Sequence, residues 1–406
     1  MKKSTLIKIL VGLALFSVAG LVHIAFNVTG LLGAGGDLRW VNTGRGIHYT
    51  LDAAPVFHGS GGTFTLATRD GVRGLTQVGE TRFHYSMTLR SPIMVGRGEF
   101  TAVSEGDRGR VIHVFDANGR IFSENFDHPV HTFSINSTGF MTAILQLDEG
   151  YAIQAFHRNE RGGPLYNNRI FPHDNPGIIP VAAEKSENGR YMLYGWLDVN
   201  NRLVSRVQLA FTYQGDAWGT DRIFFGRDFE DEMLLHLRMT ANNRIVIITD
   251  RRIEILTRGL GDVIATTAMI PLYNQLTQLA FDNSGRFAVS MGAAFLNAPD
   301  AAAVGSVHIF DANGTRLGVY ENERVVTHLS MEHGAVIVGS GRNFTAVNLS
   351  GTLLWEFIAL SDVRDFFFLE NSDTVLIGGP ARADVWRRVR NRDGEGDFFG
   401  ITGQQP

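Results

Sequence analysis

The chain has 406 residues, of which 44% are hydrophobic, so it can bury a substantial core as two average domains or one large repeat domain. It contains no cysteine, which excludes disulfides, thiolate nucleophiles, Fe–S clusters and cysteine-ligated zinc. Removing Lys2, Lys3 and Lys8 from the 37 basic residues leaves 34 against 41 acidic ones, a net charge of −7. A negative body repels nucleic acid, so we expect no nucleic-acid partner.

The N-terminal residues have the pattern of a transmembrane anchor. Residues 9–26 are apolar except for His23, and at 1.5 Å per residue they span roughly 27 Å, close to a bilayer core. Three lysines precede them, so the positive-inside rule predicts a cytoplasmic tail (1–8), an anchor (9–29) and an extracytoplasmic remainder. A cleaved signal peptide is the alternative, because Ser17-Val18-Ala19 fits a cleavage site.

Residues 30–46 are predicted as a linker, and residues 47–406 as one all-β domain of short alternating segments separated by Asp, Asn and Gly turns. Two stretches nearly duplicate each other, VIHVFDANG at 111–119 and SVHIFDANG at 306–314. With this strand as a ruler, eight copies begin near residues 72, 111, 151, 206, 252, 307, 344 and 384. An apolar strand, a polar turn with Gly and another apolar strand precede the copies. A step of about 40 residues with four strands per unit predicts an eight-bladed β-propeller, with seven blades as the alternative.

The ends of the domain predict how the ring closes. The first unit, over residues 54–78, lacks an obvious fourth strand, whereas residues 397–402 (DFFGIT) form a spare strand after the last unit. Pairing the two would remove an exposed sheet edge. We therefore expect Phe398, Phe399 and Ile401 to complete the first sheet. A frayed tail is the alternative for this segment, and a ring closed in another way would have seven blades with the N-terminal strands packed outside.

The order of the motifs resembles a known family. TLATRDGV, SPIMV, VIHVFDANGR and NGRYMLYGWLDVNNRLVSRVQL follow the short anchor. The series resembles a group of single-pass proteins of Gram-positive bacteria, catalogued as a domain of unknown function, over roughly residues 5–390, and residues 195–201 are its most specific part. The resemblance implies a membrane-anchored propeller and brings no catalytic residues. The units are also similar, more distantly, to quinoprotein-like and WD40-like propellers, although the chain lacks the cysteines of the quinoprotein enzymes.

Two duplicated patterns are candidates for chemistry. His113 and His308 occupy equivalent repeat positions, which lie far apart in a propeller unless they face the axis, so we expect half-buried strand histidines. The Asp-Ala-Asn-Gly sequences at 116–119 and 311–314 resemble a shortened calcium loop. Because the twelfth position does not hold the bidentate Glu that such a loop needs, we expect hairpin turns there.

The other candidates are single patterns. Residues 228–232 (DFEDE) place four carboxylates within five residues and could hold a cation, but we expect a solvated loop because no histidine or second acidic cluster adjoins them. Glycine-rich residues 59–62 precede no helix or lysine, so we expect a turn between strands and no phosphate site. His23 is expected near the outer interface of the anchor, without a chemical role. No Gly-x-Ser-x-Gly, His-Glu-x-x-His or Walker pattern occurs.

These features predict no catalytic, cofactor-binding or metal-ligating residue, and no cofactor. The expected function is that of a non-catalytic binding or scaffold module for a protein or cell-envelope ligand. The expected location is the cell membrane, crossed once, with the N-terminus in the cytoplasm and the propeller outside. The alternative is a quinoprotein-like or lactonase-like propeller enzyme acting on a small extracellular substrate. Only the predicted propeller architecture supports this alternative.

Overall fold

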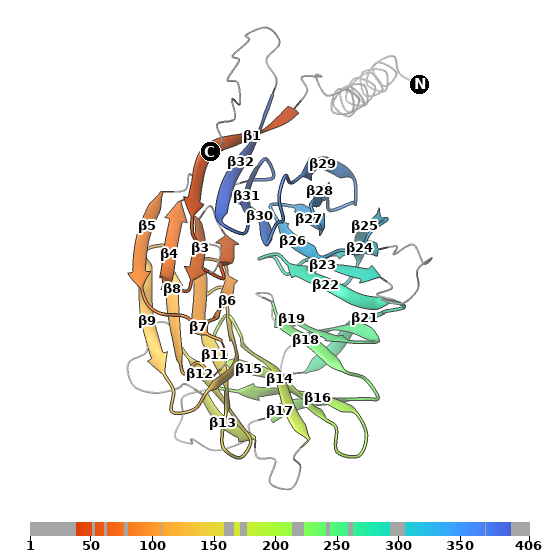
Figure 1. The fold of residues 1–406 in the computed structure, drawn as a ribbon. Helices are drawn as coiled ribbons and strands as arrows, with labels where there is room; N and C mark the ends of the chain where they lie inside the picture. The colour runs from red at the N-terminus through yellow and green to blue at the C-terminus, as the bar shows by residue number, and fades with distance from the viewer. Residues whose placement is uncertain are drawn as a thin grey trace, which may run out of the picture. The chain divides into compact units, whose positions relative to one another are not determined.

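The computed structural model describes residues 38–50, 53–60, 63–76, 80–106, 108–157, 166–170, 177–212, 223–240, 244–258, 263–292, 305–369 and 371–390. Their regular secondary structure consists of β-strands (Figure 1). The chain divides into two compact units, one of residues 42–387 and one of residues 1–41 with 388–406. The predicted anchor lies outside the described residues, and no helix within them is long and apolar enough to span a bilayer.

The described strands form eight four-stranded antiparallel sheets, which are the blades of a propeller. Blades 1 to 4 are each made of four consecutive strands: β2 (Val56–Ser60), β3 (Thr63–Thr68), β4 (Gly71–Thr76) and β5 (Thr81–Ser86); β6 (Pro92–Arg97), β7 (Phe100–Glu105), β8 (Val111–Asp116) and β9 (Gly119–Asn125); β10 (Val130–Ile135), β11 (Met141–Gln146), β12 (Tyr151–Phe156) and β13 (Tyr166–Ile170); β14 (Ile178–Lys185), β15 (Tyr191–Asp198), β16 (Val204–Phe211) and β17 (Ile223–Glu230).

Blades 5 to 7 follow the same order: β18 (Leu234–Met239), β19 (Arg244–Thr249), β20 (Arg252–Arg258) and β21 (Ile264–Pro271); β22 (Gln275–Phe281), β23 (Phe287–Gly292), β24 (Gly305–Phe310) and β25 (Arg316–Asn322); β26 (His328–Glu332), β27 (Ala335–Ser340), β28 (Asn343–Asn348) and β29 (Leu353–Ile358). Blade 8 has the order β30 (Asp365–Phe368), β31 (Thr374–Gly378), β32 (Arg382–Arg390) and β1 (Leu38–His48). The prediction of an eight-bladed all-β propeller is therefore confirmed.

The first strand of the chain closes the ring from within blade 8. The Thr43 hydroxyl donates to the Val385 carbonyl at 2.9 Å, and the Tyr49 amide donates to the Ala381 carbonyl at 3.0 Å. Ile47 is buried in a cluster shared by blades 8 and 1. An outer strand drawn from the opposite end of the chain thus covers the free edge of β32.

This arrangement corrects the predicted closure. Blade 1 has its own fourth strand, β5, so residues 397–402 are not needed to complete it, and they lie outside the described residues. The segment predicted as a linker, 30–46, contains most of β1. Both errors concern outer strands with few buried side chains, one in β1 and none in β5, so the apolar signal by which a strand is recognised is weak in each.

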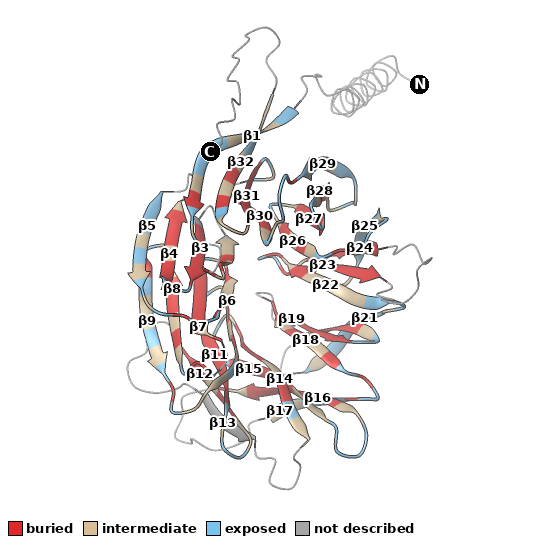
Figure 2. Ribbon diagram, viewed as in Figure 1, coloured by how far each residue is buried: buried red, intermediate tan, exposed pale blue. Residues whose placement is uncertain are grey.

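The eight ruler strands are the third strands of the eight blades, as the repeat spacing indicated. Second strands such as β23 and β27 are buried along nearly their whole length, which is why they read as continuous apolar runs. Fourth strands such as β5 and β29 are largely exposed. Figure 2 shows this gradient within the propeller unit, with buried residues concentrated on the middle strands and exposed ones on the outer strands.

Apolar clusters bridge neighbouring blades all the way round the propeller unit. Six such clusters join consecutive blades from 1 to 7, and a seventh joins blade 8 to blade 1. Blades 7 and 8 meet through Phe344 and Phe366, whose stacked rings lie 4.3 Å apart, and through the Trp355 indole, which donates to the Ser372 carbonyl at 2.9 Å. Each blade therefore buries both of its faces, which an isolated four-stranded sheet cannot do.

Strand direction gives the propeller two distinct faces. The connections between blades lie beside the turns between second and third strands, as shown by the Leu272 amide donating to the Arg251 carbonyl at 2.7 Å. We call this the connection face. The turns from first to second and from third to fourth strands form the opposite face. β1 runs antiparallel to β32 and ends at the connection face, so its residues near Asn42 and the end of β32 near Arg387 both lie toward the opposite face.

Candidate functional site

Charged side chains converge at the propeller axis. Arg97 ends β6 in blade 2 and is only 7% exposed. Its Nη2 donates to the carbonyl of Met239 in blade 5 at 2.7 Å, and its guanidinium lies 3.6 Å from the carboxylates of Glu184 and Glu187. Blades 2 and 5 are not neighbours, so the contact between these innermost strands must cross the axis.

Glu184 links the same group to a second arginine. It lies on β14, is buried, and accepts the Met239 amide at 2.7 Å. Nη1 of Arg238 lies 3.4 Å from its other oxygen, and the Arg238 guanidinium packs over the Phe281 ring at 5.2 Å. The hydrogen bonds and paired charges offset part of the cost of removing these ions from water.

Two histidines complete the group, which we call the axial cluster: His58, Arg97, Glu184, Glu187, His236 and Arg238. Burial, against a raising effect of a hydrogen bond with the Gly98 backbone, and the positive charge of Arg238 together lower the pKa of His58 to about 4. Burial likewise lowers the pKa of His236 to about 4, against a raising effect of Glu184. Both imidazoles are therefore neutral at pH 7, and the His236 ring stacks on Phe281 at 5.6 Å.

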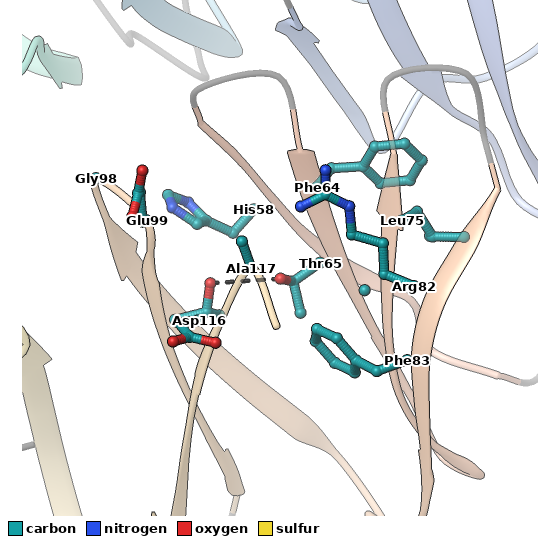
Figure 3. A pocket seen from close by; sticks show the side chains of 12 residues that line it. His58, Phe64, Thr65, Leu75, Arg82, Phe83, Gly98, Glu99, Asp116 and Ala117 are labelled. Carbon is teal, nitrogen blue, oxygen red and sulfur yellow. Dashed lines mark hydrogen bonds between the residues drawn. The ribbon is translucent and has the colours of Figure 1, made fainter. Parts of the chain in front are cut away.

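A pocket adjoins the axial cluster between blades 1 and 2 (Figure 3). His58 forms part of its wall beside Gly98 and Glu99. The Thr101 hydroxyl donates to the Thr65 hydroxyl at 3.5 Å inside it. Its remaining lining residues are Phe64, Gly74, Leu75, Arg82, Phe83, Asp116 and Ala117. The pocket opens at the opposite face and offers hydroxyl, imidazole, guanidinium and carboxylate groups to a small polar ligand.

Sequence reasoning missed the axial cluster. The signal that marks it is a charged residue near the end of an otherwise apolar first strand, as in PIMVGR (β6), VAAEK (β14) and LLHLRM (β18). One such residue, Lys185, is 2% exposed, donates to the Thr212 hydroxyl at 3.1 Å and packs over the Phe140 ring at 5.2 Å. It therefore joins blades 3 and 4 rather than the axial cluster.

The duplicated histidines lie on strands and are half-buried, as predicted. His113 on β8 and His308 on β24 are half-buried in blades 2 and 6, and burial lowers the pKa of each. Their rings contact Ser123 at 2.7 Å and Ser306 at 3.0 Å. The structure places them in separate blades and does not bring them together.

The Asp-Ala-Asn-Gly sequences form the predicted hairpin turns. The Asp116 carboxylate accepts the amides of Asn118 at 2.7 Å and Gly119 at 3.1 Å, which closes the turn from β8 to β9. Asp311 accepts the Asn313 amide at 2.8 Å in the turn from β24 to β25. Both carboxylates are engaged by turn amides, which is the usual role of Asp at this position.

Three of the four carboxylates of residues 228–232 pair with arginines. Asp228 pairs with Arg206 at 2.6 Å, and that bond lowers the pKa of Asp228. Glu230 pairs with Arg202, and Glu232 with Arg252. The expected solvated loop is wrong in part, because residues 228–230 belong to β17 and Glu232 is buried. Among the described residues, no group of three or more His, Asp or Glu side chains is arranged to hold a metal ion.

The two remaining candidates are the glycine-rich residues 59–62 and His23. Gly59 and Ser60 belong to β2 and pair with β3, as a turn between strands requires, while residues 61–62 lie outside the described residues. A Cβ at Gly59 would lie 2.1 Å from the Phe367 ring, so this glycine permits the contact between blades 1 and 8. His23 lies outside the described residues.

The connection face exposes large apolar side chains at several blade boundaries. Tyr273, between blades 5 and 6, is 86% exposed, and Leu360, between blades 7 and 8, is 91% exposed. Ile93 at the start of β6, Val199 in the turn from β15 to β16, and Met233 before β18 are also exposed on this face. The connection face is thus a second candidate site, one with apolar contacts.

Comparison with known proteins identifies the family. Residues 57–385 match the family of unknown function DUF5711. The chain belongs to this family. The DUF5711 match extends from β2 in blade 1 to β32 in blade 8, so it includes every blade and confirms the resemblance to a family of unknown function. A search of curated proteins found no match.

Solved structures similar to this DUF5711 protein share little sequence with it. A eukaryotic initiation factor is 11% identical with a TM-score of 0.47, covering 80% of this chain and 88% of that one. The Neurospora crassa Pan2 WD40 domain is 12% identical (TM-score 0.42; coverage 86% and 95%). Kluyvelomyces marxianus Hsv2 is 11% identical (TM-score 0.42; coverage 79% and 88%). The propeller assignment rests on the sheet order given above.

Proposed function

We propose that this DUF5711 protein is a non-catalytic binding module that recognises a protein partner through its connection face. The observation that carries the proposal is the set of large apolar side chains exposed on that face, above all Tyr273 and Leu360, which lie at two blade boundaries. Aromatic and large aliphatic side chains in such positions are typical anchors of protein interfaces. Apolar side chains suit a protein surface better than a hydrophilic envelope polymer, which is the other ligand that the sequence suggests.

The second part of the proposal is that the module is held outside the cytoplasm by residues 9–29. The lysines at the N-terminus and the apolar stretch after them support this topology.

Photo-cross-linking in cells tests the interface. A photoreactive amino acid is placed at the position of Tyr273 or of Leu360, and, as a matched control, of Leu353, which is 51% exposed but begins β29 at the opposite face. The proposal expects the same protein adduct from the first two positions and none from the third. Equal labelling of all three positions, absence of an adduct, or an adduct removed by a cell-wall hydrolase would overturn it.

Protease accessibility tests the topology. Protease added to intact protoplasts should digest the full-length protein beyond about residue 36, because the positive-inside rule places everything after the anchor outside. The N-terminal lysines should stay protected. A propeller that survives this treatment but is digested after lysis would show that it lies in the cytoplasm.

A further inference from the structure

Within the described residues, several nitrogen atoms of the axial cluster lack a hydrogen-bond partner, and those of Arg97 and Arg238 are donors. Four of its nitrogen atoms are buried without a hydrogen-bond partner in the part of the chain that the structure describes: Nε2 of His58, Nη1 of Arg97, Nε2 of His236 and Nε of Arg238. They come from β2, β6 and β18, so three separate blades contribute to the group. Leaving a buried polar group unpaired is unfavourable, because the group loses its hydrogen bonds to water on folding and gains none in the protein. A ligand that forms hydrogen bonds with these four atoms would therefore stabilise the folded protein.

The acceptors of the cluster are already engaged. One oxygen of Glu184 accepts the Met239 amide at 2.7 Å, and the other faces Arg238. The Glu187 carboxylate accepts the Ser137 hydroxyl at 2.6 Å. Nη1 of Arg97 lies 3.6 Å from Glu184, which is within ion-pair range but too long for a hydrogen bond. A ligand that completes the group must therefore bring acceptor oxygens of its own.

We propose that the axial cluster binds a small monocarboxylate. A carboxylate presents two acceptor oxygens in the geometry that matches a guanidinium fork. Glu184 and Glu187 already offset the charges of Arg97 and Arg238, so the cluster can accommodate one further negative charge more readily than two. This argument favours a carboxylate over a doubly charged phosphate. His58 belongs to the cluster and also lines the pocket between blades 1 and 2, so the cluster adjoins a pocket at the opposite face. The inference is independent of the proposed protein partner at the connection face.

Titration calorimetry of the full-length protein in neutral detergent tests the assignment. The probes are acetate, its uncharged analogue acetamide, and inorganic phosphate, each at matched ionic strength in chloride. Acetate should bind at least tenfold more tightly than acetamide or phosphate. The melting temperature should rise with acetate concentration in parallel, because a ligand that binds only the folded state stabilises it. No acetate binding beyond the chloride control would overturn the proposal, as would equal binding of all three probes.

Matched variants localise the site. Arg238→Lys keeps the positive charge but removes Nε, and His236→Gln removes the imidazole without a change of charge at pH 7; each should weaken acetate binding at least tenfold. Arg286→Lys is the control, because Arg286 pairs with Asp282 in blade 6 at 2.6 Å and lies outside the cluster. It should bind acetate as the parent does. If Arg238→Lys does not fold, the acetate affinity of His236→Gln alone tests whether acetate binds at the cluster. Unchanged affinity in the folded variants would show that acetate binds elsewhere and would refute the proposal.

Discussion

Ring closure by β1 predicts a specific pattern of stability changes. Ile47 is 7% exposed and packs in the cluster between blades 8 and 1. Truncation of a buried Ile to Ala costs about 2–5 kcal/mol. The entropy of unfolding is about 2.1 cal/mol/K per residue, or about 0.7 kcal/mol/K for a unit of roughly 350 residues. Ile47→Ala should therefore lower the melting temperature by about 3–7 °C.

A glycine in the same strand gives an independent test of its pairing with β32. A Cβ at Gly46 would lie 2.5 Å from Oδ1 of Asp384 and 2.9 Å from the Ala383 carbonyl. Such distances require one strand to shift, so Gly46→Ala should also lower the melting temperature by several degrees, as overpacking costs about 1–3 kcal/mol. Val41→Ala is the matched control, because Val41 is in β1 but is 36% exposed, and its effect should be below about 1 °C.

Calorimetric melting of the full-length protein in detergent measures all three variants. The competing closure, with residues 397–402 in blade 1, predicts the reverse pattern: deletion of those residues would destabilise the protein, and changes in β1 would have little effect. If Ile47→Ala and Gly46→Ala melt like the parent, β1 does not close the ring and the argument from the sheet order fails.

Three further changes test the buried charges and the turns. Arg227→Met should cost about 3–5 kcal/mol in urea unfolding, because it leaves the fully buried Glu254 without its ion pair at 2.7 Å. Burial raises the pKa of Glu332 to about 8, so the folded state holds a proton that the unfolded state releases above about pH 4.5; the free energy of unfolding should fall as pH rises from 4.5 to 8, and Glu332→Gln should flatten that slope relative to the parent. Gly351→Ala should lower the melting temperature, because φ is +84° and a Cβ would lie 2.1 Å from the Val319 carbonyl.

The repeat pattern was predictable because it depends on residues that are close together in the sequence. Third strands end in turns whose Asp or Asn side chain caps the following amides, as Asp116 and Asp311 do, and such turns need Gly soon after. Second strands are buried on both faces and are therefore apolar throughout. Neither signal depends on distant parts of the chain, so the number of blades and the position of each ruler strand follow from the sequence.

The closure and the axial cluster were not predictable in this way. β1 has one fully buried side chain, Ile47, and two glycines, and its hydrogen bonds depend on the free edge of a strand more than 300 residues later. The contact between Arg97 and Met239 spans 142 residues and crosses the axis. In both cases the residue types are unremarkable locally, and their roles arise only when the ring brings distant strands together.

Because β1 pairs with β32, the last described strand, the propeller begins before residue 47, where composition predicts its start. A soluble fragment that starts at residue 47, the predicted start of the domain, would lack nearly all of β1 and expose the edge of β32. An exposed edge is a site of association between sheets. Blade 8 also cannot be completed until β32 has been synthesised, so β1 must wait, unpaired, for the rest of the chain, and such long-range pairing is slow. Residues 42–48 are therefore part of the folding unit of the propeller, and a change there affects the stability of the whole ring.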